Sequence, residues 1–182
     1  MPHYKLSYFA LRMRAEPIRM LLSLAEKPYE DVRVSFEEWP SLKTCQSSGF
    51  AGKNAFECAW ADAIADQMAG FFMEYRPWYI VRVKYVEGDE QELYEEVYKP
   101  AITKHLPLMV KLLKKSSSGW LVGDSLTYAD IVVACTTDTL KNIDPYYENV
   151  VWDYPELADH RKKVFDVPAI RKHVETRAND PR

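Results

Sequence analysis

YKLSYFALRMRAEPIRMLLSLAEKPYEDVRV, residues 4–34, is the stretch that decides the fold of this 182-residue chain. Its first part, residues 4–10, is rich in aromatic residues that roughly alternate with other side chains, which predicts a strand. Apolar residues then recur at helical spacing over residues 14–27, and Pro17 stands in the first turn, where a missing N–H costs little. Residues 29–34 predict a short second strand. A strand, helix and strand with such short connections predict a parallel pair joined by a crossover helix.

The chain after this stretch predicts helices and no further strand. Residues 35–54 contain no convincing strand pattern, and from Ala55 onward every segment reads as helix. We expect a long helix over residues 55–75, ended or kinked at Pro77 because proline lacks the N–H that a helix interior needs. Its apolar stripe has a spacing of four residues and consists of Phe56, Trp60, Ile64 and Met68. Further helical segments are predicted at residues 90–115, interrupted by Pro100 and Pro107, and at residues 155–165 and 168–177.

The clearest local signal marks the start of a helix after Ser125. Thr127 can cap this helix while Asp130, three residues later, bonds back to it, and Leu126 can pack against Ile131 as a hydrophobic staple. This capping box is interpreted as a folding device, not as part of a chemical site.

A piece of two strands and one helix is too small to be an independent domain. It has little face to bury and leaves strand edges open, so it must dock on the helices or be incomplete. The sequence therefore predicts an α+β chain, with residues 1–49 as a small α/β domain and residues 50–182 as an all-helical domain.

Composition and charge exclude several classes of function. The net charge of −3 gives no strongly basic face, so a nucleic-acid partner is not expected. No apolar run approaches the roughly 20 residues of a membrane span, and the start of the chain lacks the features of a signal peptide, which favours a cytoplasmic protein. Three scattered cysteines (Cys45, Cys58, Cys135) and four well-separated histidines predict neither a disulfide framework nor a metal site.

The sequence resembles the sigma-class cytosolic glutathione transferases, especially the nematode-type enzymes and the related glutathione-dependent prostaglandin D synthases. The resemblance starts with LSYFALRMRAEPIRMLLSLAEKPYEDVRVSFEEWPSLK, residues 6–43, and continues in the same order through FAGKNAFECAWADAIADQ, GWLVGDSLTYAD and VPAIRKHVETR. It implies a thioredoxin-like N-terminal domain followed by an all-helical domain.

The resemblance also implies that the N-terminal domain is truncated. Members of the family follow β-α-β with β-β-α, whereas this chain passes from Lys43 to Phe50 and the first long helix. The missing part would be about 30 residues on typical element lengths. In relatives it carries a cis-proline loop and a Gln-Ser pair that hold glutathione. Gln46-Ser47 is not followed by a helix, so this role is not assigned to it.

Tyr8 matches the catalytic tyrosine of the family. A phenolic O–H donated to the glutathione sulfur favours the thiolate, which is the nucleophile that attacks the electrophile. Without the resemblance, Tyr8 is one aromatic residue in an aromatic-rich strand, and core packing is the alternative.

Three further residues match glutathione-binding positions. The resemblance implies that Arg14 tunes the tyrosine electrostatically, although it could also be a solvated residue of the first helical turn. Trp39 and Lys43 match positions that grip the glycine end of glutathione, and Trp39 could instead anchor its own loop. Met13 stands where relatives commonly have glycine, so a less relaxed turn is expected before the helix.

The resemblance also implies a pocket for the electrophile between the first strand and the helical domain. Side chains at such spacing can equally be core residues. Relatives place an aspartate that reaches across the dimer near positions 69 and 70, where this chain has Ala69 and Gly70. The matching pocket positions are Phe9, Arg12, Phe72, Trp78, Val132 and Thr136.

Three interpretations of function follow. The first is a glutathione transferase that conjugates glutathione, its co-substrate, to small apolar electrophiles, with possible peroxidase or prostaglandin isomerase activity, acting as a homodimer if the interface survives. The second is a catalytically impaired binding protein of the same family that has lost most of the glutathione site. The third is a shortened isoform or imperfect gene model of a normal enzyme.

Overall fold

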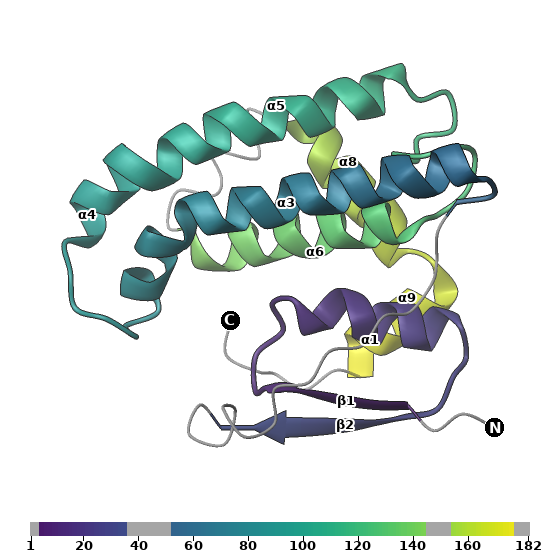
Figure 1. Ribbon diagram of the computed structural model, residues 1–182, viewed down its shortest axis with the longest axis horizontal. Coiled ribbons are helices and arrows are strands. Elements are labelled where there is room, and N and C mark those ends of the chain that lie inside the picture. Colours follow the sequence, from purple (N-terminus) through teal and green to yellow (C-terminus); the bar gives the residue numbers. More distant parts are fainter. Residues whose placement is uncertain (1–3, 36–51, 145–153, 177–182) are drawn as a thin grey trace.

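The computed structural model describes residues 4–35, 52–144 and 154–176. A layer of helices lies over a small β–α–β segment, and the last helix, α9, returns to lie beside this segment (Figure 1). Trp39 and Lys43, expected to bind glutathione, and the Gln46-Ser47 pair fall outside the described residues.

The β–α–β segment has the predicted order. Strand β1 (Tyr4–Phe9) pairs in parallel with β2 (Tyr29–Val34), in a register that runs from Tyr4 opposite Tyr29 to Phe9 opposite Val34. Helix α1 (Ala15–Leu24) connects them. The prediction of a parallel pair with a crossover helix is therefore confirmed.

Helix α3 (Ala55–Arg82) is longer than predicted. Asn54 caps its start by accepting the backbone N–H of Glu57 at 3.0 Å. The expectation that Pro77 could end the helix is wrong, because the helix continues for five residues beyond it. The residue after the proline, Trp78, is fully buried, and its burial offsets the lost backbone hydrogen bond. The ribbon bends near its C-terminal end (Figure 1).

The second long helical segment contains a π-helical turn. Helix α4 (Glu90–Leu93) passes into the π-helix η1 (Tyr94–Tyr98), which leads into α5 (Lys99–Lys115). The backbone N–H of Lys99 bonds the carbonyl of Tyr94, five residues back. This wider turn comes directly before Pro100, which cannot donate an α-helical bond. Pro107, by contrast, lies inside α5 without ending it.

The predicted capping box begins helix α6 (Tyr128–Ile143). The backbone N–H of Thr127 donates to Asp130 Oδ2 at 2.8 Å, as predicted. Leu126 packs against the buried cluster that contains Ile131, as the staple requires. The last two helices, α8 (Pro155–Phe165) and α9 (Pro168–Thr176), lie close to their predicted positions.

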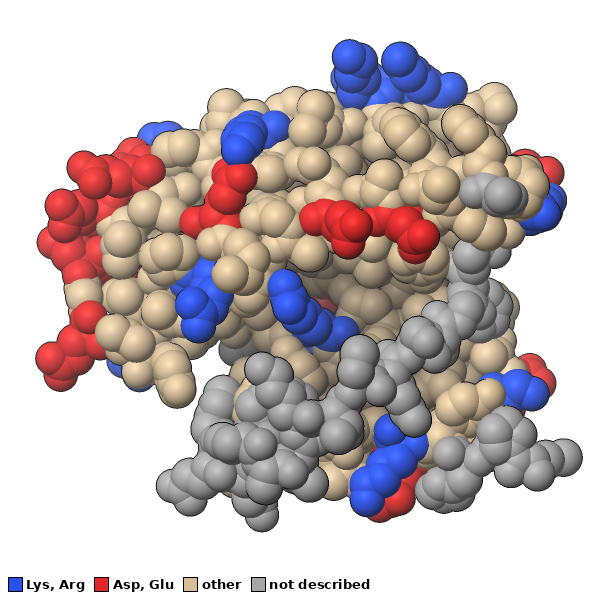
Figure 2. All heavy atoms as spheres, in the orientation of Figure 1, with Lys and Arg blue, Asp and Glu red and all other residues tan. Residues whose placement is uncertain are grey.

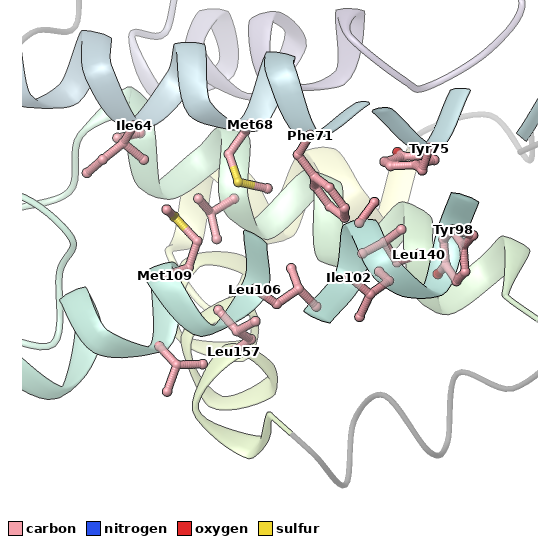
Figure 3. Packing of buried hydrophobic residues seen from close by; sticks show 14 of the residues in the cluster. Ile64, Met68, Phe71, Tyr75, Tyr98, Ile102, Leu106, Met109, Leu140 and Leu157 are labelled. Atoms are coloured by element: carbon pink, nitrogen blue, oxygen red, sulfur yellow. The ribbon is translucent and has the colours of Figure 1, made fainter. Parts of the chain in front are cut away.

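One large apolar core holds the helical layer together. Side chains of α3, η1, α5, α6 and α8 point toward one another in it (Figure 3). It includes Ile64, Met68, Phe71, Tyr75, Tyr98, Ile102, Leu106, Met109, Leu140 and Leu157.

A second, smaller core docks the β–α–β segment on the helices. Met20 of α1 is fully buried among side chains of α6, α8 and α9. Its neighbours are Ile131, Ala134, Cys135, Val164 and Ile170. The expectation that the small segment docks on the helical domain is thus confirmed.

None of the helices within the described ranges is both long and apolar enough to cross a membrane. The same ranges hold no group of three or more histidine, cysteine, aspartate or glutamate side chains that could bind a metal ion.

Candidate functional site

Tyr8 lies near the end of β1, opposite Arg33 of β2, and its side chain is half-buried. Burial raises the pKa of the Tyr8 phenol above its ordinary value of 10.0. The charge of Arg14 and a hydrogen bond from the Arg14 backbone N–H oppose this shift without cancelling it. The phenol therefore keeps its proton at neutral pH and can donate a hydrogen bond.

The turn between β1 and α1 brings Arg14 next to Tyr8. The Leu11 N–H bonds the Phe9 carbonyl at 2.7 Å, and Met13 has a φ of +32°. A positive φ is unfavourable for a side chain larger than glycine, so the expected strain in this turn is confirmed. Met13 packs against the large core, which anchors the turn to the helical layer.

Arg14 connects the two parts of the molecule. Its guanidinium carbon lies 5.2 Å from the ring centroid of Phe72 on α3, a cation–π distance. Tyr8 and Arg14 belong to the β–α–β segment and Phe72 to the helical layer. The surface is hollowed between these two parts (Figure 2). The structure thus brings together a proton donor, a cation and an aromatic face.

The pocket residues expected from the first strand and its loop lie at this junction. Phe9 follows Tyr8 and meets its ring edge-on, with ring centroids 5.3 Å apart. Arg12 is largely buried, and its Nη1 lies 3.9 Å from Asp138 Oδ2 on α6. Arg12 therefore ties the loop to α6 by an ion pair.

The pocket residues expected from the helices are divided between surface and core. Phe72 is half-buried, and so are Val132 and Thr136 on α6, where the Thr136 hydroxyl donates to the Val132 carbonyl at 2.9 Å. Trp78, in contrast, has an exposed fraction of 0%, and its ring centroid lies 4.0 Å from that of Tyr98. It belongs to the large core, and a ligand could reach it only if the core opened.

A buried ionic network lies beside the site, and the sequence analysis did not identify it. Arg19 Nη1 lies 3.2 Å from Glu16 Oε2, and Arg19 Nε lies 3.2 Å from Asp31 Oδ2 on β2. On α9, His173 Nε2 lies 3.1 Å from the other carboxylate oxygen of Glu16. The only sequence signal was an acid and a base three residues apart in an otherwise apolar stretch of helix, a spacing that places both on one face.

Two tyrosines of α3 were also missed. Tyr75 and Tyr79 follow Phe72 at three and seven residues, and both rings meet the Phe72 ring edge-on, at centroid distances of 5.3 and 6.0 Å. Burial first, and the neighbouring Tyr8 second, raise the pKa of Tyr79 to about 12. The spacing 72, 75, 79 identifies one helix face, but it does not say that this face meets Tyr8.

Comparison with known proteins identifies the family of this chain. Residues 77–177 match the family model of the glutathione S-transferase C-terminal domain. The chain belongs to the glutathione S-transferase family. Probable glutathione S-transferase 8 of Caenorhabditis elegans is 33% identical over 204 positions, which cover 97% of this chain and 98% of that relative.

Solved structures of family members resemble the whole chain. The structure described as monomeric Na-GST-3, a glutathione S-transferase of the hookworm Necator americanus, superposes with a TM-score of 0.89 at 38% identity and covers 100% of both chains. Prostaglandin synthase D of Nilaparvata lugens superposes with a TM-score of 0.80 at 24% identity over 97% of this chain and 100% of that one, a likeness of fold. The fold is therefore α+β, with a shortened thioredoxin-like segment and a helical transferase domain.

The alignment with the C. elegans relative is 204 positions long, although this chain has only 182 residues. The relative therefore has residues without a counterpart here, as expected of a shortened member of the family.

Proposed function

We propose that this chain conjugates reduced glutathione to small apolar electrophiles, with Tyr8 as the catalytic residue. The observation that carries the proposal is the protonated Tyr8 phenol beside Arg14, at the junction of the β–α–β segment and α3. The phenol donates a hydrogen bond to the glutathione sulfur, which favours the thiolate while the thiol proton passes to solvent. The sulfur then forms a bond to the electrophilic carbon, and the displaced electron pair leaves on the leaving group or moves onto an adjacent carbonyl oxygen.

In this proposal Arg14 supplies positive charge that favours the thiolate. Trp39 and Lys43 hold the glycine end of glutathione through an indole N–H and an ammonium group. The electrophile lies against Phe9, Phe72, Val132 and Thr136. Arg12 holds the loop of this pocket through its ion pair with Asp138, and Trp78 packs behind the pocket in the large core. Peroxidase or prostaglandin isomerase activity would use the same thiolate.

The proposal also covers the class of the enzyme, the division of the chain into two domains and the cellular location of the protein. We infer a sigma-type enzyme of the cytoplasm, with residues 1–49 as the glutathione-binding part and residues 50–182 as the helical domain.

A homodimer through the N-terminal part of α3 is also part of the proposal. Phe56 and Trp60, four residues apart near the start of this helix, have exposed fractions of 78% and 43%. Apolar exposure of this size on one helix face suits a partner surface. A Necator relative is described as monomeric, so the oligomeric state of this chain needs a direct test. Analytical ultracentrifugation measures the sedimentation of the wild type and of Phe56→Glu. A dimer that becomes a monomer in the variant supports the homodimer, and a monomeric wild type contradicts it.

The second candidate is a family member that binds apolar ligands without turnover. Two observations favour it: only two strands are formed by the described residues, and the exposed Ala69 and Gly70 stand where relatives place the aspartate. A lost charge-assisted contact costs about 1.5–3 kcal/mol, or more than tenfold in affinity. Several such losses would leave little glutathione binding.

Retention on glutathione resin, followed by turnover of 1-chloro-2,4-dinitrobenzene, separates the two candidates. The transferase is retained, and Tyr8→Phe lowers its kcat/KM by about tenfold or more, because a hydrogen bond to a charged sulfur is lost. Tyr4→Phe is the matched control, since it removes a phenolic oxygen from the same face of β1. A folded protein that flows through the resin and shows no turnover supports the binding protein.

A further inference from the structure

His173 connects helix α9 to the first turn of α1, and the two helices lie side by side (Figure 1). Its Nε2 atom lies 3.1 Å from Glu16 Oε1, and its side chain is only 11% exposed. An ionised carboxylate only accepts hydrogen bonds, so the imidazole N–H is the donor. Glu16 is buried as well, so water competes little for this bond.

The second carboxylate oxygen of Glu16 extends this contact to the β1–α1 turn. Glu16 Oε2 accepts from Arg19 Nη1 at 3.2 Å, and the same nitrogen donates to the Leu11 carbonyl at 3.3 Å. Leu11 lies in the turn between β1 and α1. The backbone N–H of Glu16 also bonds back into this turn, to the Arg12 carbonyl at 2.9 Å. A chain of hydrogen bonds therefore runs from α9 through Glu16 and Arg19 to the turn.

The turn contains a residue whose backbone needs such support. Met13 has a φ of +32°, which is unfavourable for a residue with a side chain and persists only where the surrounding structure holds it. The next residue, Arg14, lies over the Phe72 ring and donates its backbone N–H to Tyr8. Relaxation of the turn would therefore move Arg14 relative to both rings.

Arg19 also holds the strand beside Tyr8. Its Nε atom lies 3.2 Å from Asp31 Oδ2, and the same oxygen lies 2.8 Å from Arg33 Nη2. Arg33 is the register partner of Tyr8 in the parallel pair. One buried guanidinium thus contacts both the turn that follows Tyr8 and the strand next to it.

We propose that His173 is a positioning residue of the transferase site. It anchors the Glu16 carboxylate, and Glu16 together with Arg19 holds the β1–α1 turn in the conformation that keeps Arg14 beside Tyr8. His173 acts through these residues and is not itself a catalytic residue. The inference rests on the proposed transferase function, because the positioning serves that reaction.

Two substitutions separate the hydrogen bond of His173 from its packing. His173→Gln keeps an N–H donor where Nε2 lies, whereas His173→Leu keeps the bulk and removes the donor. With 1-chloro-2,4-dinitrobenzene as electrophile, His173→Leu should lower kcat by about three- to tenfold, because a misplaced Arg14 and Tyr8 stabilise the thiolate less. Its KM for glutathione should change by less than about twofold, and His173→Gln should retain the wild-type kcat within about twofold.

His105→Leu is the matched control. It also removes a buried histidine beside a glutamate, since His105 Nε2 lies 3.0 Å from Glu74 Oε2, but this pair joins α3 and α5 and includes no residue of the β–α–β segment. It should leave kcat unchanged. Thermal unfolding shows whether each variant is folded at the assay temperature. Should His173→Leu fail to fold, His173→Asn replaces it, because its shorter amide does not reach the position of Nε2.

Three results of these assays would overturn the role of His173. They are a wild-type kcat in His173→Leu, an equal loss in His105→Leu, and a loss in His173→Gln as large as that in His173→Leu. In the last case the packing of the side chain would matter and its hydrogen bond would not.

Nuclear magnetic resonance tests the placement of Tyr8 without glutathione or turnover. In protein that carries 13C at the ζ-carbon of tyrosine, the signal of Tyr8 is identified by its absence in Tyr8→Phe, and its position reports the hydrogen bonding of the phenol at neutral pH. The signal should shift in His173→Leu and keep its wild-type position in His173→Gln and His105→Leu. An unchanged signal in His173→Leu would contradict the positioning role. A wild type without turnover, in which the Tyr8 signal responds as predicted, would support this role and contradict the transferase function alone.

Discussion

His173 Nε2 lies 3.1 Å from Glu16 Oε1, although 157 residues separate the two in the chain. Glu16 is in the first turn of α1 and His173 is in α9, so this ion pair joins the first and last helices that the structure describes. Arg19 completes the arrangement by pairing with both Glu16 and Asp31. This network and the Met20 cluster together fix the shortened β–α–β segment against the helical domain, and they thereby hold Tyr8 opposite α3.

Removal of Arg19 should destabilise the protein strongly. Arg19→Ala leaves the buried Glu16 carboxylate without its main partner, and breaking a buried pair in this way costs about 3–5 kcal/mol. Urea unfolding at neutral pH measures the free energy of unfolding. Lys5→Ala is the control, because Lys5 forms an exposed pair with Glu30 at 3.7 Å, which should contribute less than about 1 kcal/mol. Similar losses in both variants would contradict the role of the buried network.

Asp130 should be among the most sensitive positions of the helical domain. Its carboxylate is fully buried and accepts the N–H groups of Leu121 and Thr127 at 2.8 Å, with His160 Nε2 at 2.9 Å. Asp130→Ala leaves these buried groups without a partner, so we expect a loss of about 3 kcal/mol in the free energy of unfolding.

Thr127→Ala provides the comparison, since it alters the cap but keeps the Asp130 carboxylate. It should cost about 1 kcal/mol. If thermal and urea unfolding gave equal losses for the two variants, Asp130 would act as a helix cap alone.

Stability should fall steeply above pH 10 because several tyrosines are buried as neutral phenols. Burial raises the pKa values of Tyr75, Tyr79 and Tyr98 in the folded state, to about 12 for Tyr79, whereas unfolded tyrosines titrate near 10. A raised folded pKa gives stability that is complete below pH 10 and is lost as the pH rises toward the folded value. Each such tyrosine contributes a loss of about 1.4 kcal/mol per pH unit.

Urea unfolding from about pH 9 to about pH 11.5 measures this slope. Tyr79→Phe should reduce the slope of the unfolding free energy with pH by the contribution of one tyrosine. Phe72→Leu changes the same cluster but removes no titrating group, so it should leave the slope unchanged. Identical slopes in the wild type and Tyr79→Phe would show that Tyr79 titrates normally.

The elements of this fold are set by local signals, which is why the sequence predicted them. Residues 29–34 form a strand over the predicted range, and Thr127 and Asp130 form the predicted capping box, because the sequence signal for each lies within a few neighbouring residues. The sequence predicts that Pro77 ends or kinks the helix, and it does not end it, because the burial of Trp78 in a tertiary core outweighs the local preference of proline. Local sequence cannot report such a contribution.

The candidate site likewise combines residues that the sequence identifies with long-range contacts that it does not. The resemblance located Tyr8 and Arg14, and the structure brings them together at one junction. The contacts that position this junction, from Glu16 to His173 and from Arg14 to Phe72, join residues that are far apart in the chain. These contacts depend on how α1 docks on α6 and α9 and on how Arg14, just before α1, meets α3, and no local sequence pattern predicts either arrangement.

The pKa of the glutathione thiol in the complex tests the central claim most directly. Titration of the protein–glutathione complex, followed by the ultraviolet absorbance of the thiolate, should give a thiol pKa at least about one unit below the free value near 8.5 in the wild type. In Tyr8→Phe the pKa should return toward that free value, while Tyr4→Phe should match the wild type. A thiol pKa that is the same in the wild type and Tyr8→Phe would contradict the assignment of Tyr8 as the catalytic residue.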